Sequence, residues 1–424
     1  MKYFKTDGIR GEAYTEVTLS LAYKIGLFFS TIDTPVVVGM DTRESSPELA
    51  LAIIKGLGNH KNITFAGVIP TPGLMYYSLT KNTIGIMVTA SHNNYKDNGI
   101  KIFENGIKIS KDYIRQIELF IDKNQDIIYK EIFDSNELKI NDDVVGIYLD
   151  FLTEKMPNLR MNVVFDGANG AFSDILKQLF NQNYLINCSP NGKNINHDCG
   201  SQSPSKLINA VKNKQADIGI AFDGDGDRLI VVDKFNRIYE GDLITYIFAK
   251  YLHENNLLLG NTVVFTEVVN PGILHRLDEL DIQYVLVEVG DQNIYKALES
   301  GYVIGGEASG HIINKTILPF GDGLINALEL IKILKIENKK MHEYLFGIKL
   351  YQSKKQNLIT NPNNFEISKK TKDKIERFAK RRNITFIYRK SGTEKLIRLF
   401  MYQPTNKKID KNMAKIVSMI KNDR

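Results

Sequence analysis

The sequence predicts an α/β protein built from several similar units. Runs of branched apolar residues alternate with amphipathic stretches at helical spacing, and this alternation occurs three times along the chain. The 424 residues also suffice for several domains of ordinary size, each with its own core. We therefore predict three consecutive α/β units.

The first unit begins with the strand-like run Pro35–Gly39, which is followed by the amphipathic stretch Glu48–Leu57. A second apolar run, Ile63–Val68, precedes Pro70–Gly73. Proline is favoured in the first turn of a helix, so this last segment predicts a second helix start. The unit is therefore predicted to run strand, helix, strand, helix.

The second and third units each show one strand followed by one helix. In the second, the run Asn162–Asp166 precedes a helix from about Phe172 to Phe180. In the third, Asn261–Phe265 precedes a helix from about Gly272 to Glu279. No strong residue-level repeat relates the units, so their similarity rests on the pattern alone.

Polar and helical segments mark the limits of the units. The polar stretch Asp134–Asp143 precedes a predicted helix over Val144–Glu154, a second helical stretch covers Leu243–His253, and another boundary falls near Glu337–Tyr351. The predicted domains are residues 1–140, 141–245, 246–345 and 346–424. The last one ends in the amphipathic stretch Lys407–Lys421, whose apolar stripe predicts a core-facing helix.

Three aspartates alternate with glycines between two strand-like runs, at Asp223, Asp225 and Asp227. Carboxylates this close repel one another, and hard oxygen ligands on a flexible glycine loop are typical of a Mg²⁺ site. Mg²⁺ held by few carboxylates usually also binds water and a phosphate oxygen, so the loop predicts phosphoryl chemistry. The alternative, an acidic hairpin turn, explains one Asp-Gly pair but not two followed by Asp-Arg.

A candidate nucleophile lies at the end of another strand-like run. The run Ile86–Ala90 ends at Ser91 and His92, and Lys101 follows shortly after. A serine with a nearby histidine and lysine can act as a covalent nucleophile, and a phosphate on Ser91 would be the metal's missing ligand. Alone, the segment also fits a plain turn, but together with the acidic loop it favours phosphoryl transfer.

Two further loops carry groups that bind phosphate and sugar. The first combines arginines, hydroxyls and a glycine: Arg389, Ser391, Gly392, Thr393 and Arg398. Guanidinium groups, hydroxyls and free backbone N–H groups suit a phosphate dianion, although a basic hairpin has a similar composition. The second places Glu307, Ser309 and His311 on a glycine loop, where they could bind sugar hydroxyls or an amine. Taken alone, this second loop fits an ordinary polar loop better.

These four segments, in this order, resemble the α-D-phosphohexomutases, the superfamily of phosphoglucomutase, phosphomannomutase and phosphoglucosamine mutase. The resemblance covers nearly the whole chain and extends to Tyr3–Gly11, Gly39–Arg43, Pro70–Gly73 and Asp166–Gly170. It implies three topologically related α/β domains plus a smaller C-terminal α+β domain around a central cleft. The phosphoserine, metal, sugar and phosphate loops are expected in the first to fourth domains, in that order.

The resemblance also implies a role for each group. Ser91 would carry the phosphoryl group, and Asp223, Asp225 and Asp227 would hold one Mg²⁺ against its phosphate. Four side chains would complete the reacting centre: Arg10 and Arg228 as phosphate-stabilising cations, Lys101 as the preferred general acid or base, and His92 as the second choice. A lysine that acts as a base needs a lowered pKa.

Sugar and distal phosphate would be bound by the two remaining loops. Glu307 and Ser309 would hold the sugar, with weaker support from His311. The non-reacting phosphate would be held by Arg389, Ser391, Gly392, Thr393 and Arg398.

Within the superfamily, the chain looks most like the phosphoglucosamine mutase branch, notably at Asp97–Lys101 and Pro190–Asn196. Gln292 and Ala308 stand where that branch usually has arginine and glutamine, in segments that contact substrate in the family. The expected reaction is therefore interconversion of glucosamine 6-phosphate and glucosamine 1-phosphate through a phosphoserine, with a sugar 1,6-bisphosphate as intermediate and primer. Phosphoglucomutase or phosphomannomutase activity by the same mechanism is the alternative.

Two other classes of protein fit the sequence less well. A phosphatase would transfer the phosphoryl group to water, and it would not need separate sugar and distal phosphate loops. A non-catalytic sugar-phosphate sensor would not need Ser91, Lys101 and all three aspartates intact.

The composition is that of a cytoplasmic enzyme, and the resemblance implies a small hexose or hexosamine phosphate as its partner. The hydrophobic and charged fractions, 43% and 25%, are ordinary for a globular protein, and the net charge of +6 does not argue for nucleic acid. Cys188 and Cys199 form no disulfide framework. We find no signal-peptide pattern and no apolar run long enough to cross a bilayer, so we expect no membrane partner. The oligomeric state is left open.

Overall fold

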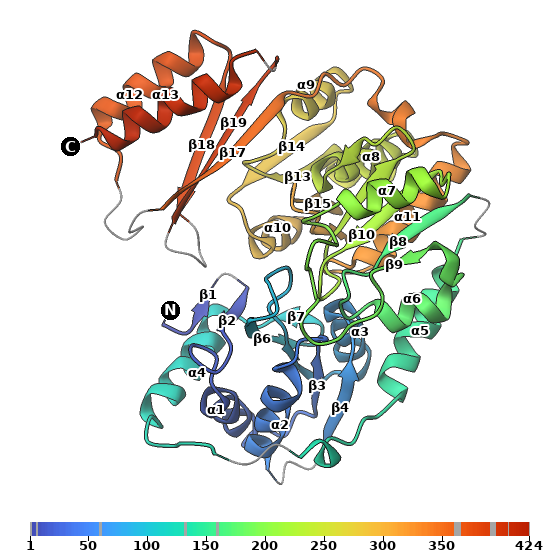
Figure 1. Ribbon diagram of the computed structural model, residues 1–424, viewed down its shortest axis with the longest axis vertical. Coiled ribbons are helices and arrows are strands. Elements are labelled where there is room, and N and C mark those ends of the chain that lie inside the picture. The colour runs from blue at the N-terminus through green and yellow to red at the C-terminus, as the bar shows by residue number, and fades with distance from the viewer. Residues whose placement is uncertain are drawn as a thin grey trace.

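The computed structural model describes residues 2–5, 7–58, 62–130, 134–157, 161–359, 366–390, 396–405 and 407–423. Its strands form four sheets that follow one another along the chain, each packed against helices (Figure 1). The first sheet lies at the bottom of that view and the fourth at the upper left. The predicted α/β class is confirmed, whereas the limits of the domains stay a prediction.

The first sheet has seven strands in mixed orientation. Their order is β1 (Phe4–Lys5), β2 (Gly8–Glu12), β6 (Asp97–Glu104), β5 (Ile84–Val88), β3 (Val36–Met40) and β4 (Ile63–Val68), with β7 (Ile107–Lys108) paired to β6. The helices are α1 (Leu19–Phe29), α2 (Ser46–Leu57), α3 (Thr71–Lys81) and α4 (Lys111–Lys123). Every residue of β3 is buried because Val36 and Val38 pack in the cluster of α1 and α2, whereas Val37 packs in that of α3.

Helices α1 and α2 approach each other closely through two glycines. A Cβ on Gly26 would lie 2.0 Å from the carbonyl oxygen of Ile53, and a Cβ on Gly56 would lie 2.0 Å from that of Tyr23. Real Cβ atoms do not come this close to a backbone oxygen, so glycine is required at both positions.

The second sheet carries the acidic loop. Its strands run in the order β12 (Ile238–Tyr239), β11 (Leu229–Asp233), β10 (Ile218–Phe222), β8 (Val163–Asp166) and β9 (Leu185–Ile186). The helices around it are α5 (Asp143–Lys155), α6 (Ser173–Leu179), α7 (Ser205–Asn213) and α8 (Gly241–Glu254), with short turns η1 (Ser135–Glu137) and η2 (Gln182–Tyr184). Strands β10 and β11 pair antiparallel from Phe222↔Leu229 onward, so the three aspartates lie in their connecting loop.

The third sheet is built from four strands, in the order β14 (Gln283–Val287), β13 (Thr262–Thr266), β15 (Ile304–Gly306) and β16 (Ile312–Asn314). Its helices are α9 (Pro271–Glu279), α10 (Asp291–Leu298) and α11 (Gly323–Ile336), with η3 (Leu259–Asn261) and η4 (Met341–Leu345). The helices predicted in the second and third units agree with α6 and α9 to within a few residues. The loop between β15 and β16 carries the candidate sugar-binding residues.

The fourth sheet is small and antiparallel, in the order β17 (Gln352–Ile359), β19 (Leu396–Gln403) and β18 (Thr385–Lys390). Helices α12 (Lys369–Lys380) and α13 (Ile409–Lys421) pack on it. The buried stripe of α13 contains Met413, Ile416 and Ile420, which confirms the core-facing helix. This domain therefore has a core of its own.

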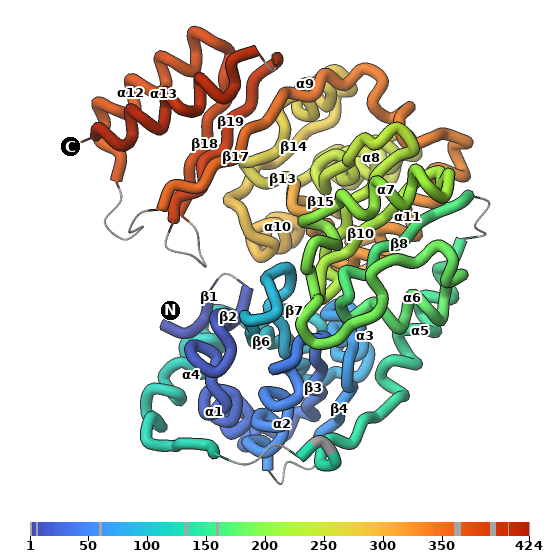
Figure 2. The backbone as a smooth tube through the Cα atoms, viewed as in Figure 1, coloured from blue at the N-terminus to red at the C-terminus, as the bar shows by residue number. Residues whose placement is uncertain are grey.

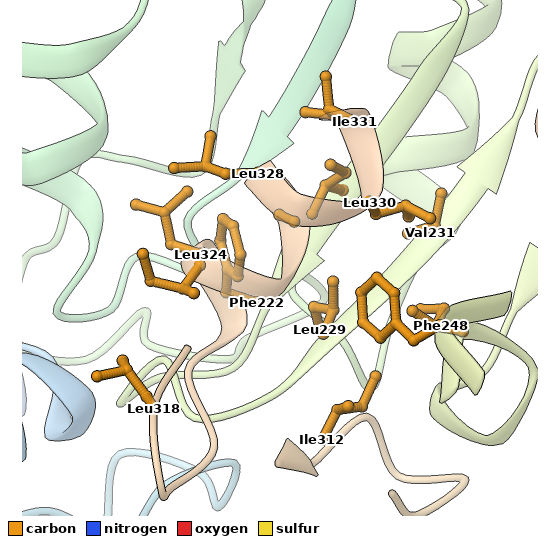
Figure 3. Close-up of a cluster of buried hydrophobic side chains, with 14 of the residues drawn as sticks. Phe222, Leu229, Val231, Phe248, Ile312, Leu318, Leu324, Leu328, Leu330 and Ile331 are labelled. Atoms are coloured by element: carbon orange, nitrogen blue, oxygen red, sulfur yellow. The ribbon is translucent and has the colours of Figure 1, made fainter. Parts of the chain in front are cut away.

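The second and third sheets share one core, which fixes their loops relative to each other. Figure 3 shows Phe222 of β10, Leu229 of β11, Phe248 of α8 and side chains of α11 gathered in one apolar cluster. Helix α11 belongs to the third domain by sequence but packs on the second sheet. The acidic loop and the sugar loop are thereby held by a common rigid body.

The first domain meets the second through α3 and α5, which lie against each other (Figure 2). Tyr76 of α3 stacks on Phe151 of α5, with ring centroids 4.3 Å apart. Among the described residues, none of the helices is both long and apolar enough to span a membrane.

Candidate active site

Ser91 lies just beyond the carboxyl end of β5, in a conformation that is rare for serine. Its φ of 53° is in the left-handed region, and its side chain is fully buried. Such a conformation costs on the order of 1–3 kcal/mol and persists only where the surroundings enforce it. The turn at Ser91 is therefore held by its neighbours.

Two side chains distant in sequence hold this turn. Arg43 donates from Nη2 to the carbonyl oxygens of Ser91 and Asn93, both at 2.9 Å, and from Nε to Asp41 Oδ2 at 2.9 Å. From the second domain, Asn196 Nδ2 donates to the same two carbonyl oxygens at 2.8 and 3.0 Å. The buried guanidinium and the amide together fix the backbone from which the Ser91 hydroxyl projects.

The Ser91 hydroxyl is aimed at the acidic loop. Its Oγ donates to Asp223 Oδ2 across 2.7 Å, and it lies 3.4 Å from His92 Nδ1. The structure thus brings together the candidate nucleophile of the first domain and the first aspartate of the second.

The three aspartates form a compact, buried cluster that fits a divalent cation. One oxygen from each of Asp223, Asp225 and Asp227 lies within 4.8 Å of the others, and Oδ1 of both Asp225 and Asp227 is buried without a hydrogen-bond partner among the described residues. Burial, with repulsion from Asp227 and Asp225, raises the pKa of Asp223 well above its usual value. Repulsion within the cluster is therefore not fully compensated at Asp223, and hard carboxylate oxygens suit Mg²⁺.

Lys101 supplies the nearest cation. It lies on β6, and its Nζ is 2.8 Å from Asp225 Oδ2, 2.9 Å from Asp227 Oδ2 and 3.1 Å from Asp7 Oδ2. Burial alone would lower the pKa of Lys101, but these three carboxylates raise it well above its usual value. The lowered pKa that a lysine base requires is not found; in this arrangement Lys101 is an ammonium ion.

His92, in contrast to Lys101, is uncharged. Burial and the neighbouring cations Arg228 and Arg10 lower the pKa of His92 well below its usual value, so the imidazole is neutral. Arg228 Nε lies 3.9 Å from Asp223 Oδ2, and Arg10 Nη2 lies 3.0 Å from Asp7 Oδ2. Arg10 and Arg228, which were predicted to bind phosphate, therefore both lie near His92 and the neighbouring Ser91.

The β15–β16 loop presents Glu307 in a fixed orientation. Its Oε1 accepts from the backbone N–H of Gly290 at 2.8 Å, and its Oε2 accepts from Ser309 Oγ at 2.8 Å. His311 is directed elsewhere: its Nδ1 lies 3.8 Å from Asp227 Oδ2 and its Nε2 lies 3.7 Å from Asp291 Oδ2. Glu307 and Ser309 act as a pair, whereas His311 contacts the acidic loop.

In the fourth domain, Arg389 of β18 and Arg398 of β19 are directly paired across the sheet. Like charges at such a position repel, and burial together with Arg398 lowers the pKa of Arg389. A dianion between them would relieve that repulsion, which agrees with a phosphate site. The other predicted residues of this loop, Ser391, Gly392 and Thr393, lie outside the described residues.

Several residues that shape the site had no role assigned from the sequence: Arg43, Thr71, Asn196, Asp7, Lys108 and Asp291. Arg43, Thr71, Asp7 and Asn196 lie in segments that carry the resemblance to the phosphohexomutases. The available signal for Arg43 was its place in the Gly39–Arg43 segment that follows a predicted strand and carries the resemblance. Asp291 adjoins Gln292, in a segment already compared with the family, whereas Lys108 gave no signal because it looks like an ordinary surface charge in sequence.

Comparison with known proteins assigns the family. Sequence models of the phosphoglucomutase/phosphomannomutase α/β/α domains I, II and III match residues 1–127, 146–236 and 240–351. A phosphoglucosamine mutase of Anoxybacillus flavithermus is 38% identical, over 99% of this chain and 98% of its own length. This chain belongs to the phosphoglucosamine mutase family. Family membership makes it an isomerase-class enzyme, an intramolecular phosphotransferase.

Other relatives agree with this assignment. A phosphoglucosamine mutase of Bacillus velezensis is 37% identical, over 100% of this chain and 99% of its own length. Among solved structures, a phosphoglucomutase/phosphomannomutase family protein of Burkholderia thailandensis superposes with a TM-score of 0.78 at 22% identity, covering 99% and 98% of the two chains. An Aspergillus fumigatus N-acetylphosphoglucosamine mutase, solved with GlcNAc-6P and magnesium, gives 0.67 at 16% identity, covering 99% and 96%. At such identities these structures show a shared fold.

Proposed function

We propose that this enzyme interconverts glucosamine 6-phosphate and glucosamine 1-phosphate, with Ser91 as the phosphoryl carrier. The observation that carries the proposal is the 2.7 Å hydrogen bond from Ser91 Oγ to Asp223. It puts a buried nucleophile against a cluster of metal-type ligands, which is what phosphoryl transfer requires. The sugar is taken from the names of the full-length relatives, which are phosphoglucosamine mutases.

Asp223, Asp225 and Asp227 would hold the metal, with the phosphate of Ser91 as a further ligand. When bound, Mg²⁺ neutralises the charge that spreads over the transferring phosphoryl group. Arg228 and Arg10 add fixed positive charge beside the same group, and they are already oriented by Asp223 and Asp7.

In the transfer step, the bond between Ser91 Oγ and phosphorus breaks while the sugar hydroxyl oxygen bonds to that phosphorus, and Ser91 Oγ takes up one proton to regenerate the hydroxyl as the sugar hydroxyl gives one up. The proton of the sugar hydroxyl must leave, and it is returned to the sugar oxygen in the reverse step. Lys101 remains our choice for the group that accepts this proton and later returns it. With Asp225 and Asp227 engaged as metal ligands, it would lose two of the three carboxylates that raise its pKa, which favours proton release. The neutral His92 is the alternative acceptor.

Two loops would orient the sugar phosphate. Glu307, held by Gly290 and Ser309, presents a carboxylate to the sugar hydroxyls or to an amine. Arg389 and Arg398 would bind the phosphate that does not react, together with Ser391, Gly392 and Thr393 as predicted from the sequence. The 1,6-bisphosphate then reverses its orientation and returns its other phosphate to Ser91.

The test is mutase turnover by the purified protein with Mg²⁺ and glucose 1,6-bisphosphate as primer, comparing kcat/KM for glucosamine, glucose and mannose phosphates. A preference for the glucosamine compound supports the proposal. A preference for glucose or mannose phosphates would keep the mechanism and reject the sugar, with Gln292 and Ala308 as the first positions to exchange. A cytoplasmic location stays a prediction from the sequence.

A further inference from the structure

Six charged side chains form a closed ring of ion pairs beneath the reacting centre. From Lys101, the ring passes through Asp7, Lys108, Asp291, His311 and Asp227 and back to Lys101, with signs that alternate when His311 is protonated. The members come from the first domain, from the acidic loop of the second and from the third. None of them belongs to the loops assigned to the distal phosphate.

Asp7 would be the one remaining carboxylate partner of Lys101 among these three once the other two bind a metal. Lys101 pairs with Asp225, Asp227 and Asp7, and the first two are the proposed metal ligands. Asp7 Oδ2 is shared between Lys101 at 3.1 Å and Arg10 at 3.0 Å. The position of Asp7 therefore determines where Nζ of Lys101 can lie.

Asp7 is in turn anchored to the third domain through Lys108. Lys108 Nζ pairs closely with Asp7 Oδ1 and with Asp291 Oδ2. Asp291 is the first residue of α10 and directly follows Gly290, whose N–H donates to Glu307 at 2.8 Å. Lys108 and Asp291 thus connect Lys101 of the first domain to Glu307 of the third through a short series of contacts.

The side chain of Lys108 borders unfilled space. A cavity of about 170 Å³ adjoins it, lined by Lys101, Lys108, Asp291, His311, Ile313 and Phe320. An apolar side chain of similar length therefore has room there, so a Lys108→Met substitution removes the charge with little change in volume. What Lys108 contributes there is its charge, which separates two carboxylates that would otherwise repel each other.

We propose that Lys108 and Asp291 are positioning residues that set Lys101 relative to the sugar-binding Glu307. This inference rests on the proposed function, because it assigns a purpose to the position of Lys101 in the mutase reaction. Without Lys108, Asp7 keeps Lys101 and Arg10 as partners and Asp291 keeps His311, but the direct link between Asp7 and Asp291 is lost, so Asp7 is free to move toward Arg10 and Lys101. Displacement of a catalytic group by about 1 Å can cost roughly a hundredfold in rate.

The experiment compares Lys108→Met, Asp291→Asn, the double variant and Lys108→Arg, assayed as full-length protein with Mg²⁺, glucose 1,6-bisphosphate and glucosamine 6-phosphate. We expect each of the first two to lower kcat roughly 10- to 100-fold, with KM changed less than about threefold. The double variant should be no worse than the poorer single one, because the residues act as one pair. Lys108→Arg should recover part of kcat.

The matched control is Lys193→Met. It removes an ion pair with Glu44 that also joins two domains, at 3.2 Å, but is largely exposed and outside the ring. Its kcat should equal that of the wild type. Wild-type kcat in Lys108→Met, a loss confined to KM, or an equal loss of kcat in Lys193→Met would overturn the inference. A wild-type protein without mutase turnover would reject the proposed function itself, and the inference with it.

Discussion

Thr71 and Asp225 form two hydrogen bonds across the boundary of the first and second domains. The Thr71 hydroxyl donates to Asp225 Oδ2 at 2.6 Å, and the Thr71 N–H donates to the Asp225 carbonyl oxygen at 2.8 Å. Thr71 is the first residue of α3, so the positive end of that helix also faces the acidic loop. The aspartate at the centre of the triad is therefore oriented by the other domain.

The first prediction concerns this hydroxyl. Thr71→Val keeps the shape of the side chain but leaves Asp225 Oδ2 without one donor, so Mg²⁺ affinity should fall roughly 10- to 100-fold. Thr71→Ser keeps the donor and should bind Mg²⁺ as the wild type does. Calorimetric titration with Mg²⁺ measures both, and equal affinity in Thr71→Val would show that the contact does not orient the triad.

The second prediction tests the close approach of α1 and α2. Gly26→Ala would force a methyl group to within 2.0 Å of the carbonyl oxygen of Ile53, so we expect a loss of about 1–3 kcal/mol of stability. Gly146→Ala in α5 is the matched control, because a Cβ there meets nothing within 4 Å. It should stabilise the helix by about 0.5–1 kcal/mol. If the thermal unfolding midpoints of Gly26→Ala and Gly146→Ala shifted in the same direction, the close packing of α1 against α2 would be contradicted.

The third prediction concerns the pH dependence of stability. Asp322 caps α11 by accepting from the N–H groups of Leu324 and Ile325, and it also accepts from the Tyr148 hydroxyl at 2.8 Å. Burial raises its pKa from 3.8 to about 6. The folded protein therefore binds more protons than the unfolded chain between these values, so the stabilisation is complete at low pH and is lost as the pH rises through about 6.

Asp322→Asn keeps the cap and removes this titration. The shift of about two units corresponds to about 3 kcal/mol in full, of which about 2 kcal/mol is lost above pH 4.5, so the fall in stability from about pH 4.5 to 7.5 should be smaller in the variant by about 2 kcal/mol. Burial also raises the pKa of Asp242 to about 6, so some slope should remain. Urea unfolding measured across this pH range gives the stability of each protein. If stability fell equally steeply with pH in the wild type and in Asp322→Asn, the raised pKa assigned to Asp322 would be contradicted.

The sequence was sufficient for the groups whose chemistry is local. Asp223, Asp225 and Asp227 are neighbours along the chain, so their spacing alone predicts the cluster that the structure contains. Ser91 was predicted from its place at a strand end, and the strand β5 does end just before it. Alternating strands and helices likewise predicted the three α/β units, because hydrophobic periodicity is a local signal.

The remaining features depend on contacts between distant segments, which a single sequence does not encode in any local pattern. Thr71 and Asp225 are 154 positions apart, and Lys108 and Asp291 are 183 apart. His311 lies between Asp227 and Asp291, contacts that its sequence position did not indicate, and its expected role at the sugar stays a prediction. The charge state of Lys101 also depends on such contacts, since its raised pKa requires carboxylates from two other segments.

The central claim is that Ser91 carries the phosphoryl group that is exchanged with the sugar. The most direct measurement is single-turnover transfer, in which the protein is first phosphorylated with labelled glucose 1,6-bisphosphate and Mg²⁺ and then mixed with unlabelled glucosamine 6-phosphate. The account predicts that peptide mapping finds the label on Ser91 before mixing, that the label moves to the sugar within one turnover, and that Ser91→Ala neither takes up label nor turns over. Label on another residue, or normal turnover by Ser91→Ala, would contradict the account.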